Sequence, residues 1–328
     1  MTTKKGFWEK EEKKVEAEEE KLEAEVEKLS TKAKFPIKLF GYALLAYAIG
    51  MLGAYALHLG DAHLATTNQT AYQVTPAVTH LGISTGVIYI ILAMVMIIGT
   101  TIAILKVRRL NLNQFFQAFY TFIMFYLPFA LALQLGLALG LSFFIIFFGA
   151  IAIGIAAATL YWHHKKRINV WATLIAITAI ILIGSDLPPT ILLALLCLAA
   201  TWDYIAVFVI HYMQMMVKRM ASLEQMPPIA LIDGSPEDLV AKLQSQEKGS
   251  KPKKEVGLLG LGDVILPGSV IASFAYFGLP QLALAFFGAT VLGLWLDIEW
   301  SRLKHIAIPA LVLIALADVA VLILWLVA

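Results

Sequence analysis

The sequence has little charge and almost no cysteine. Only 15% of its 328 residues are charged, 60% are hydrophobic, and the single cysteine is Cys197. A composition this apolar excludes an ordinary soluble domain and predicts a membrane protein with several spans. One cysteine excludes an internal disulfide and a cysteine metal site. A net charge of +2, with basic residues in short clusters, argues against a nucleic-acid partner.

We also expect no cleavable leader, because a long charged stretch comes before the first apolar run. Residues 1–34 are dense in Glu and Lys, with Val15, Leu22, Val26 and Leu29 at helical spacing. This pattern predicts one charged cytoplasmic helix without a catalytic role. Fewer than three heptads support the alternative, a coiled-coil contact with a partner.

Nine apolar runs are about long enough to cross a bilayer, which takes about 20 residues. They cover residues 39–59, 83–105, 114–134, 139–161, 168–184, 190–216, 256–277, 281–298 and 306–327. The predicted fold class is therefore an all-α polytopic membrane protein with nine transmembrane helices. Its parts are the charged segment 1–34, spans one to six within 35–216, a cytoplasmic loop at 217–255, and spans seven to nine within 256–328. The turn between spans three and four is placed near Gln134.

Lys and Arg are absent from every second loop between these spans. Basic residues cluster in the first segment and in the loops after spans two, four, six and eight, whereas residues 60–79 contain none. Because basic loops stay in the cytoplasm, we predict a cytoplasmic amino terminus and a carboxyl terminus outside. This orientation requires an odd number of spans. In the long loop after span six, the apolar run Ile229–Ile232 is too short to span, so we expect it to lie on the surface or to cover another element.

Two aspartates fall at the same depth in consecutive spans. Asp263 lies eight residues after Glu255, and Asp203 lies eight residues before His211. A helix rises about 1.5 Å per residue, which places each aspartate about 12 Å into the membrane from its cytoplasmic side. Since spans six and seven are antiparallel, the two carboxylates can face each other. Carboxylates inside a membrane are functional candidates.

Two facing carboxylates in a low dielectric hold one proton between them, so that one acts as base and the other as acid. The base activates a water that attacks a peptide carbonyl, and the acid protonates the carbonyl oxygen. This is the chemistry of an aspartic protease, and it uses no metal and no cofactor. A third carboxylate, Asp318, lies about 21 Å past Lys304, and we expect it to pair with a polar neighbour or to line a hydrated cavity.

The residues around Asp263 suit close packing. Gly257 and Gly260 precede it at intervals of three, which would keep one side of a helix bare for another backbone. Pro267, four residues after Asp263, cannot donate a hydrogen bond to the Asp263 carbonyl. We therefore expect a loosened helix at the aspartate.

With these residues identified, the chain resembles the presenilin and signal peptide peptidase family of intramembrane aspartic proteases. The family has a Tyr-Asp pair in span six, a Gly-x-Gly-Asp motif in span seven and a Pro-Ala-Leu motif at the start of span nine. The second motif is complete in Gly260, Leu261, Gly262 and Asp263, and the third in Pro309, Ala310 and Leu311. The first motif differs, because Trp202 replaces the tyrosine before Asp203; its indole could only donate a hydrogen bond.

The resemblance implies a catalytic dyad of Asp203 and Asp263, with Pro309–Leu311 beside it. Pro309 is expected to bend the start of span nine. The orientation is that of presenilins, since signal peptide peptidases are inverted, and the compact loops are most similar to those of an archaeal presenilin homologue. Such a protein is a multi-pass protein of a prokaryotic cell membrane, acts without other secretase subunits, and can but need not form oligomers.

The implied substrates are transmembrane helices of other proteins in the lipid bilayer. A substrate helix must unwind before water reaches its peptide bonds. We expect the unwound strand to pair with loop segments ahead of span seven, Ile229–Ile232 or Lys251–Val256.

Two other functions fit parts of the sequence. A proton- or cation-coupled transporter could use Asp203, Asp263 and Asp318 as a relay, although the chain has no internal repeat of the kind that transporters often show. A prepilin-type peptidase also carries Gly-x-Gly-Asp, but the Pro-Ala-Leu of span nine argues against it. The histidines lie scattered in loops and predict no metal site.

Overall fold

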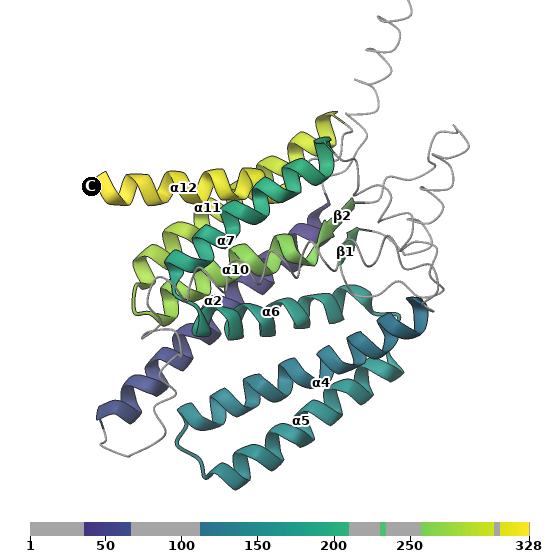
Figure 1. Cartoon of the computed structure of the whole chain (residues 1–328), viewed down its shortest axis with the longest axis vertical. Helices are drawn as coiled ribbons and strands as arrows, with labels where there is room; N and C mark the ends of the chain where they lie inside the picture. The colour runs from purple at the N-terminus through teal and green to yellow at the C-terminus, as the bar shows by residue number, and fades with distance from the viewer. Residues whose placement is uncertain (1–35, 67–111, 210–229, 234–256, 305–308, 328) are drawn as a thin grey trace, which may run out of the picture.

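The structure is a computed structural model and describes residues 36–66, 112–209, 230–233, 257–304 and 309–327. Within these ranges the chain is helical except for one pair of short strands (Figure 1). The elements are α2 (Ile37–Thr66), α4 (Leu112–Ala138), α5 (Phe143–His163), α6 (Ile168–Asp186), α7 (Pro189–Tyr204), the π-helical turn η1 (Ile205–Val209), β1 (Ala230–Asp233), β2 (Gly257–Gly260), α10 (Leu261–Tyr276), α11 (Pro280–Lys304) and α12 (Ala310–Val327).

Seven helices of the described part are long and apolar enough to cross a membrane, which confirms a helical protein with several spans. Six of them are α2, α4, α5, α6, α11 and α12, and the seventh is α7 continued through most of η1. The other predicted span found here, α10, is a shorter apolar helix of 16 residues. The predicted span at 83–105 lies outside the described residues, as do the charged segment 1–34 and most of the loop 217–255. Nine spans therefore stay a prediction.

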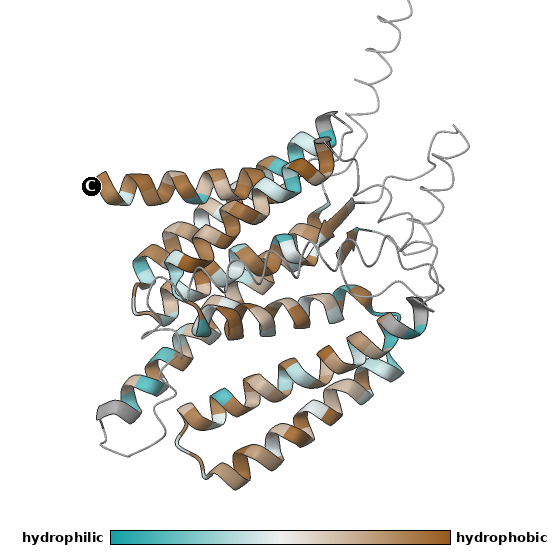
Figure 2. Ribbon diagram, viewed as in Figure 1, coloured by the Kyte–Doolittle hydropathy of each residue, from teal (hydrophilic) through white to brown (hydrophobic). Residues whose placement is uncertain are grey.

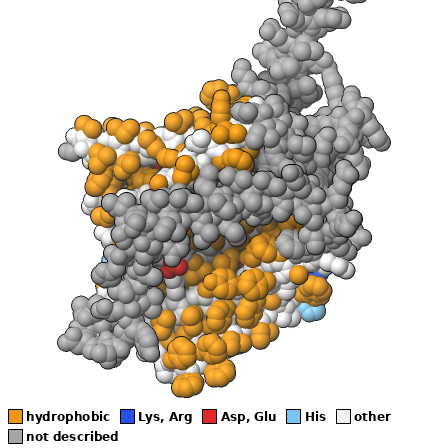
Figure 3. Space-filling view, viewed as in Figure 1, with side chains coloured by type: hydrophobic (Ala, Val, Ile, Leu, Met, Phe, Trp, Pro, Cys, Tyr) orange, Lys and Arg blue, Asp and Glu red, His pale blue; other side chains and the backbone are white. Residues whose placement is uncertain are grey.

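The outer surface of the helices is apolar, as contact with lipid requires. Large side chains such as Phe144 and Leu324 are 74% and 69% exposed. Figure 2 shows hydrophobic residues along the helices, and Figure 3 shows them covering much of the described part of one face. Most backbone polar groups of a helix bond within the helix, so this surface can face hydrocarbon.

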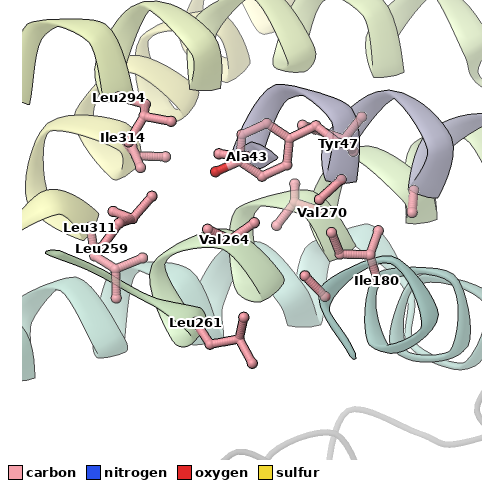
Figure 4. Packing of buried hydrophobic residues seen from close by; sticks show 14 of the residues in the cluster. Ala43, Tyr47, Ile180, Leu259, Leu261, Val264, Val270, Leu294, Leu311 and Ile314 are labelled. Carbon is pink, nitrogen blue, oxygen red and sulfur yellow. The ribbon is translucent and has the colours of Figure 1, made fainter. Parts of the chain in front are cut away.

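Helix α10 lies in the middle of the bundle and packs against α2, α6, α7, α11 and α12. Glycines permit its closest approaches. A Cβ on Gly184 of α6 would lie 2.6 Å from the Cβ of Ala272 and 3.0 Å from the Ser269 carbonyl oxygen of α10. Figure 4 shows the core around α10, where Ile180 of α6 lies near Val270 and Tyr47 of α2 lies near Val264. The first turns of α10 are thus held from several sides.

The turn between α4 and α5 lies further along the chain than predicted. Helix α4 continues through Gln134 to Ala138, and the chain reverses at Gly140, which has a φ of +66°. The side-chain amide of Gln134 donates to Asp186 at 3.1 Å and bonds with Ser185. With its amide satisfied by α6, Gln134 has no need to leave the helix, so the prediction of a turn there was wrong.

Spans seven and nine begin later than predicted. Residues 257–260, assigned by sequence to a helix, form strand β2, and α10 begins only at Leu261. The idea that Gly257 and Gly260 leave one helix side bare is therefore wrong. Glycines at both ends of this segment disfavour helix, and pairing with β1 satisfies the backbone groups that face β1. Helix α12 begins at Ala310, directly after Pro309, so Pro309 does not bend this helix from within.

From α4 onward, successive described helices run in opposite directions, whereas α2 and α4 run in the same direction. In Figure 1 the turns α4–α5, α6–α7 and α10–α11 lie at one end of the bundle, together with the end of α12. The turn α5–α6, the two strands and the start of α12 lie at the other end. The basic residues of the α5–α6 turn, Lys165 to Arg167, share that second end with the strands, which we call the strand end.

Candidate active site

Asp203 and Asp263 come together at the strand end of the bundle. Asp203 lies in the last turn of α7 and is 8% exposed. Asp263 lies in the first turn of α10 and is partly buried. The Asp263 carboxylate interacts electrostatically with Asp203 and also with Asp297 of α11. Two residues 60 positions apart in the sequence thus place their carboxylates in one site, because α7 ends where α10 begins.

Asp203 is bonded to the start of α12. The backbone N–H of Leu311 donates a hydrogen bond to the Asp203 carboxylate. Leu311 is the second residue of α12, and the first N–H groups of a helix have no partner within it. The positive end of the helix dipole also favours a carboxylate. Of the Pro-Ala-Leu motif, Pro309 and Ala310 are buried, and the motif's position at the helix start explains how it supports Asp203.

The helix around Asp203 is irregular. Directly after Tyr204 the α-helix gives way to η1, a π-helical turn. Such turns are rare and frequently occur at functional sites. Trp202, which stands where the family motif has tyrosine, is partly buried beside Asp203 in the chain.

Asp263 is bonded to the start of its own helix. Gly260 is the N-cap of α10, and its backbone N–H donates to the Asp263 carboxylate three residues later. This is one half of a capping box, in which the side chain of the third helical residue accepts a hydrogen bond from the N-cap N–H. Each of the two aspartates therefore accepts a hydrogen bond from a backbone N–H at a helix start. Leu261 is buried in the core, whereas Gly262 is exposed.

A third carboxylate belongs to this site and was missed by the sequence analysis. Asp297 of α11 is 6% exposed, and it interacts electrostatically with both Asp203 and Asp263. Its buried Oδ1 has no hydrogen-bond partner among the described residues, and the same holds for Oδ2 of Asp203. Buried polar atoms without partners are rare in folded proteins. Both oxygens remain able to accept a hydrogen bond.

Asp318 lies apart from these three carboxylates and pairs with a polar neighbour, as predicted. It is fully buried in α12, and the hydroxyl of Thr290 on α11 donates to its Oδ1 at 3.0 Å and lies 3.3 Å from its Oδ2. This hydrogen bond holds α11 against α12. Among the described residues no group of three or more His, Cys, Asp or Glu side chains could hold a metal ion.

The two strands form a small antiparallel sheet that leads into Asp263. Ala230 pairs with Gly260 and Asp233 with Gly257, so β2 runs directly into α10. Leu231 and Ile232 of β1 are buried, and β1 packs on α6 and α2, so of the two predicted placements of this segment, the one in which it covers another element holds for the described residues. The side chain of Asn169 on α6 bonds both backbone groups of Ile232, at 2.7 and 2.9 Å. This bond fixes the sheet to the bundle.

Comparison with known proteins points to one family. A family model described as signal-peptide peptidase, presenilin aspartyl protease matches residues 56–317. Among solved structures, the chain is similar to one described as a presenilin family intramembrane aspartate protease, with a TM-score of 0.54 and 17% sequence identity over 89% of this chain and 99% of that chain. At this identity the likeness concerns the fold alone. No curated protein matches the chain.

Proposed function

Because the chain belongs to the signal-peptide peptidase and presenilin family of aspartyl proteases and is therefore an intramembrane aspartic protease acting on membrane proteins, we propose that Asp203 and Asp263 are its catalytic dyad. The observation that carries the proposal is the meeting of the two carboxylates from α7 and α10, within electrostatic range of each other. Each is oriented by a backbone N–H at a helix start. The bond hydrolysed is a peptide bond within a transmembrane helix of the substrate.

The mechanism follows from the shared environment of the dyad. Two carboxylates close together in a low dielectric hold one proton between them. The ionised one takes a proton from a water whose oxygen attacks the peptide carbon, and the protonated one gives its proton to the carbonyl oxygen. The resulting diol collapses when the carboxyl group that took the proton from water gives it to the leaving nitrogen, the other carboxylate takes a proton from a diol hydroxyl, and the carbon–nitrogen bond breaks. The chain's own contribution is to hold both carboxylates and to admit water beside them.

The small sheet supports a way to present the substrate. A transmembrane helix hides its peptide bonds, so the segment to be cut must unwind, and its freed backbone groups need partners. Alternate residues of a strand direct their backbone groups to opposite edges. Since Ile232 bonds to Asn169 on the far side of β1, the pair Leu231–Leu259 carries the bonds between the strands. Leu258, opposite Ile232, then directs its N–H and C=O away from β1.

This outer edge of β2 is where we propose that the unwound substrate adds as a strand. Leu258 is 37% exposed, and the sheet has two strands within the described ranges, so no described strand lies beside that edge. A segment paired there would continue toward Asp263, five residues further along the chain. The edge of β1 is a poorer site for pairing with the substrate than the sequence predicted, because Asn169 already bonds the backbone groups of Ile232 there.

The experiment is cleavage of a single-span peptide by the purified protein in liposomes, with mass spectrometry locating the cut. We expect Asp203→Asn and Asp263→Asn each to lower kcat by about 10²–10⁴-fold, the usual contribution of acid–base catalysis. Asp186→Asn, at the opposite end of the bundle, is the matched control and should cleave normally. Cleavage by either dyad variant at the wild-type rate would reject the assignment.

A second arm of the same assay tests the strand edge. Leu258→Pro removes the outward N–H, and a proline is tolerated at a strand edge; Leu258→Ala keeps the N–H. We expect KM to rise by about tenfold in the proline variant and to change little in the alanine variant, because one substrate hydrogen bond is lost. Equal KM values in the two variants would exclude pairing at Leu258.

The alternative of a proton- or cation-coupled transporter predicts a different result. Wild-type protein would leave diverse substrates intact, and Asp203→Asn would abolish proton flux into liposomes.

We also propose the presenilin orientation, with the amino terminus in the cytoplasm, for a multi-pass protein of an archaeal-type cell membrane. The strand end would then face the cytoplasm.

A further inference from the structure

Pro267 leaves the backbone carbonyl of Asp263 without its helical partner. In an α-helix the N–H of residue 267 would donate to the carbonyl of residue 263. Proline has no N–H, and its ring also crowds the carbonyl four residues earlier. Pro267 lies inside α10 and is buried. The turn of helix that carries Asp263 is therefore missing an internal hydrogen bond.

Tyr47 supplies the missing donor from another helix. Its hydroxyl donates to the Asp263 carbonyl oxygen at 3.3 Å, although the two residues are 216 positions apart in the sequence. Tyr47 is completely buried. Its ring lies against Gly268, where a Cβ would come within 3.1 Å of Cδ1. In Figure 4 the ring extends from α2 past Val264, with its hydroxyl directed toward Ile314 of α12.

We propose that Tyr47 is a positioning residue for cleavage: its hydrogen bond fixes the turn of α10 that holds the Asp263 carboxylate in place. The proposal rests on the proposed function of Asp263. A carboxylate on a turn whose own carbonyl is unbonded can shift, and displacement by about 1 Å costs an enzyme on the order of a hundredfold in rate. Tyr47 also interacts electrostatically with Asp263.

A second tyrosine joins the same two helices without touching the site. Tyr276, at the last residue of α10, donates to Oδ2 of Asp61 on α2 at 2.7 Å. It lies 13 residues from Asp263, about 20 Å along a helix. Tyr276→Phe and Tyr47→Phe each remove one hydroxyl and one bond between α2 and α10. They differ in whether that bond acts on the turn of Asp263.

Pro267 provides an internal test of the same idea. Pro267→Ala restores an N–H that can bond the Asp263 carbonyl within the helix. With that donor present, the Tyr47 hydroxyl becomes less necessary. A positioning role acting through this carbonyl therefore predicts that Tyr47→Phe and Pro267→Ala are not additive in a double-mutant cycle. A general effect on helix packing would leave the two substitutions additive.

The experiment measures kcat, KM and thermal unfolding for the full chain in liposomes, using a single-span peptide. We expect Tyr47→Phe to lower kcat by about tenfold with KM unchanged, because the loss affects the reacting geometry and not substrate binding. Tyr276→Phe should keep kcat within about twofold of wild type. In the Pro267→Ala background, Tyr47→Phe should cost less than about threefold.

Three results would overturn the proposal: a wild-type kcat in Tyr47→Phe, an equal loss in Tyr276→Phe, or additivity with Pro267→Ala. If Tyr47→Phe does not fold, the double variant is compared with Pro267→Ala alone, and failure to recover folded, active protein also overturns it. Asp263→Asn, run in parallel, separates this inference from the proposed function. If Asp263→Asn still cleaves, the dyad fails; if it does not cleave and Tyr47→Phe is normal, only the role of Tyr47 fails.

Discussion

Gly260 keeps the space beside the Asp263 carboxylate empty. A Cβ at position 260 would lie 2.9 Å from Oδ2 of Asp263, closer than nonbonded atoms tolerate. The backbone of Gly260 has a φ of −60° and a ψ of 142°, a conformation open to any residue. The glycine is therefore needed for space and not for conformational freedom. Any side chain here would displace the Asp263 carboxylate from the Gly260 N–H, which donates a hydrogen bond to it.

We accordingly expect Gly260→Ala to lower kcat by about tenfold or more, since a displaced catalytic group loses its alignment. KM should change less than kcat. Gly288→Ala on α11 is the matched control, because a Cβ there has nothing within 4 Å. Kinetics of both variants on one single-span peptide make the comparison. A Gly260→Ala enzyme as fast as Gly288→Ala would show that the carboxylate adjusts without cost.

Some residues of the site can be found from the sequence and others cannot, for definite physical reasons. Asp203 and Asp263 are charged residues in apolar runs, and such residues are conspicuous because burial of a charge is expensive. Asp297 lies two residues before Glu299 near the end of a predicted span, where charges are ordinary. Tyr47 is one aromatic residue in an apolar run, and its partner is a backbone carbonyl from another helix. Only the packing of α2 on α10 reveals it.

At the scale of the elements, α11 and α12 approach each other closely at Gly293. A Cβ at this position would lie 2.8 Å from Cα of Ile314 and 3.0 Å from the Leu313 carbonyl oxygen. These are backbone atoms, so neither can rotate away. The same pair of helices is joined by the Thr290–Asp318 hydrogen bond. Since α12 also donates to Asp203 through Leu311, its distance from α11 affects the site.

We expect Gly293→Ala to lower the free energy of unfolding by about 1–3 kcal/mol, the usual cost of an overpacked contact. The shift of α12 should also reduce kcat. Thermal unfolding in detergent, with cleavage measured on the same samples, tests both effects. Gly288→Ala on the same helix should unfold at or slightly above the wild-type temperature, because alanine favours helix over glycine. Equal stability of the two variants would contradict the close contact.

The strands show why short elements escape sequence prediction. Each has four residues, and the pairing joins Ala230 to Gly260 across a long loop. Hydrophobic periodicity needs a longer window to separate strand from helix, so the glycines of β2 were assigned to the next helix. Asn169, in the first turn of α6, fixes β1 through its hydrogen bonds to Ile232. No local sequence pattern predicts that contact. Long apolar helices, in contrast, appeared near their predicted positions.

For the molecule as a whole, the two ends of the bundle differ in charge. The α5–α6 turn at the strand end contains Lys165, Lys166 and Arg167, whereas the α4–α5 turn at the opposite end contains no basic residue. Since Lys and Arg are retained on the cytoplasmic side during insertion, this difference supports the orientation that we propose, with the strand end in the cytoplasm.

Labelling of single-cysteine variants tests this orientation directly. Such variants are simple to make, because Cys197 is the one native cysteine to replace. In a Cys197→Ala background, Ser142→Cys places a thiol in the exposed α4–α5 turn and Lys166→Cys places one in the exposed α5–α6 turn. A membrane-impermeant maleimide should label Ser142→Cys in intact cells and Lys166→Cys only after lysis, because the basic turn lies inside. Cleavage activity of both variants shows that each is folded. The reverse labelling pattern would mean the inverted orientation and would place the dyad near the outer face.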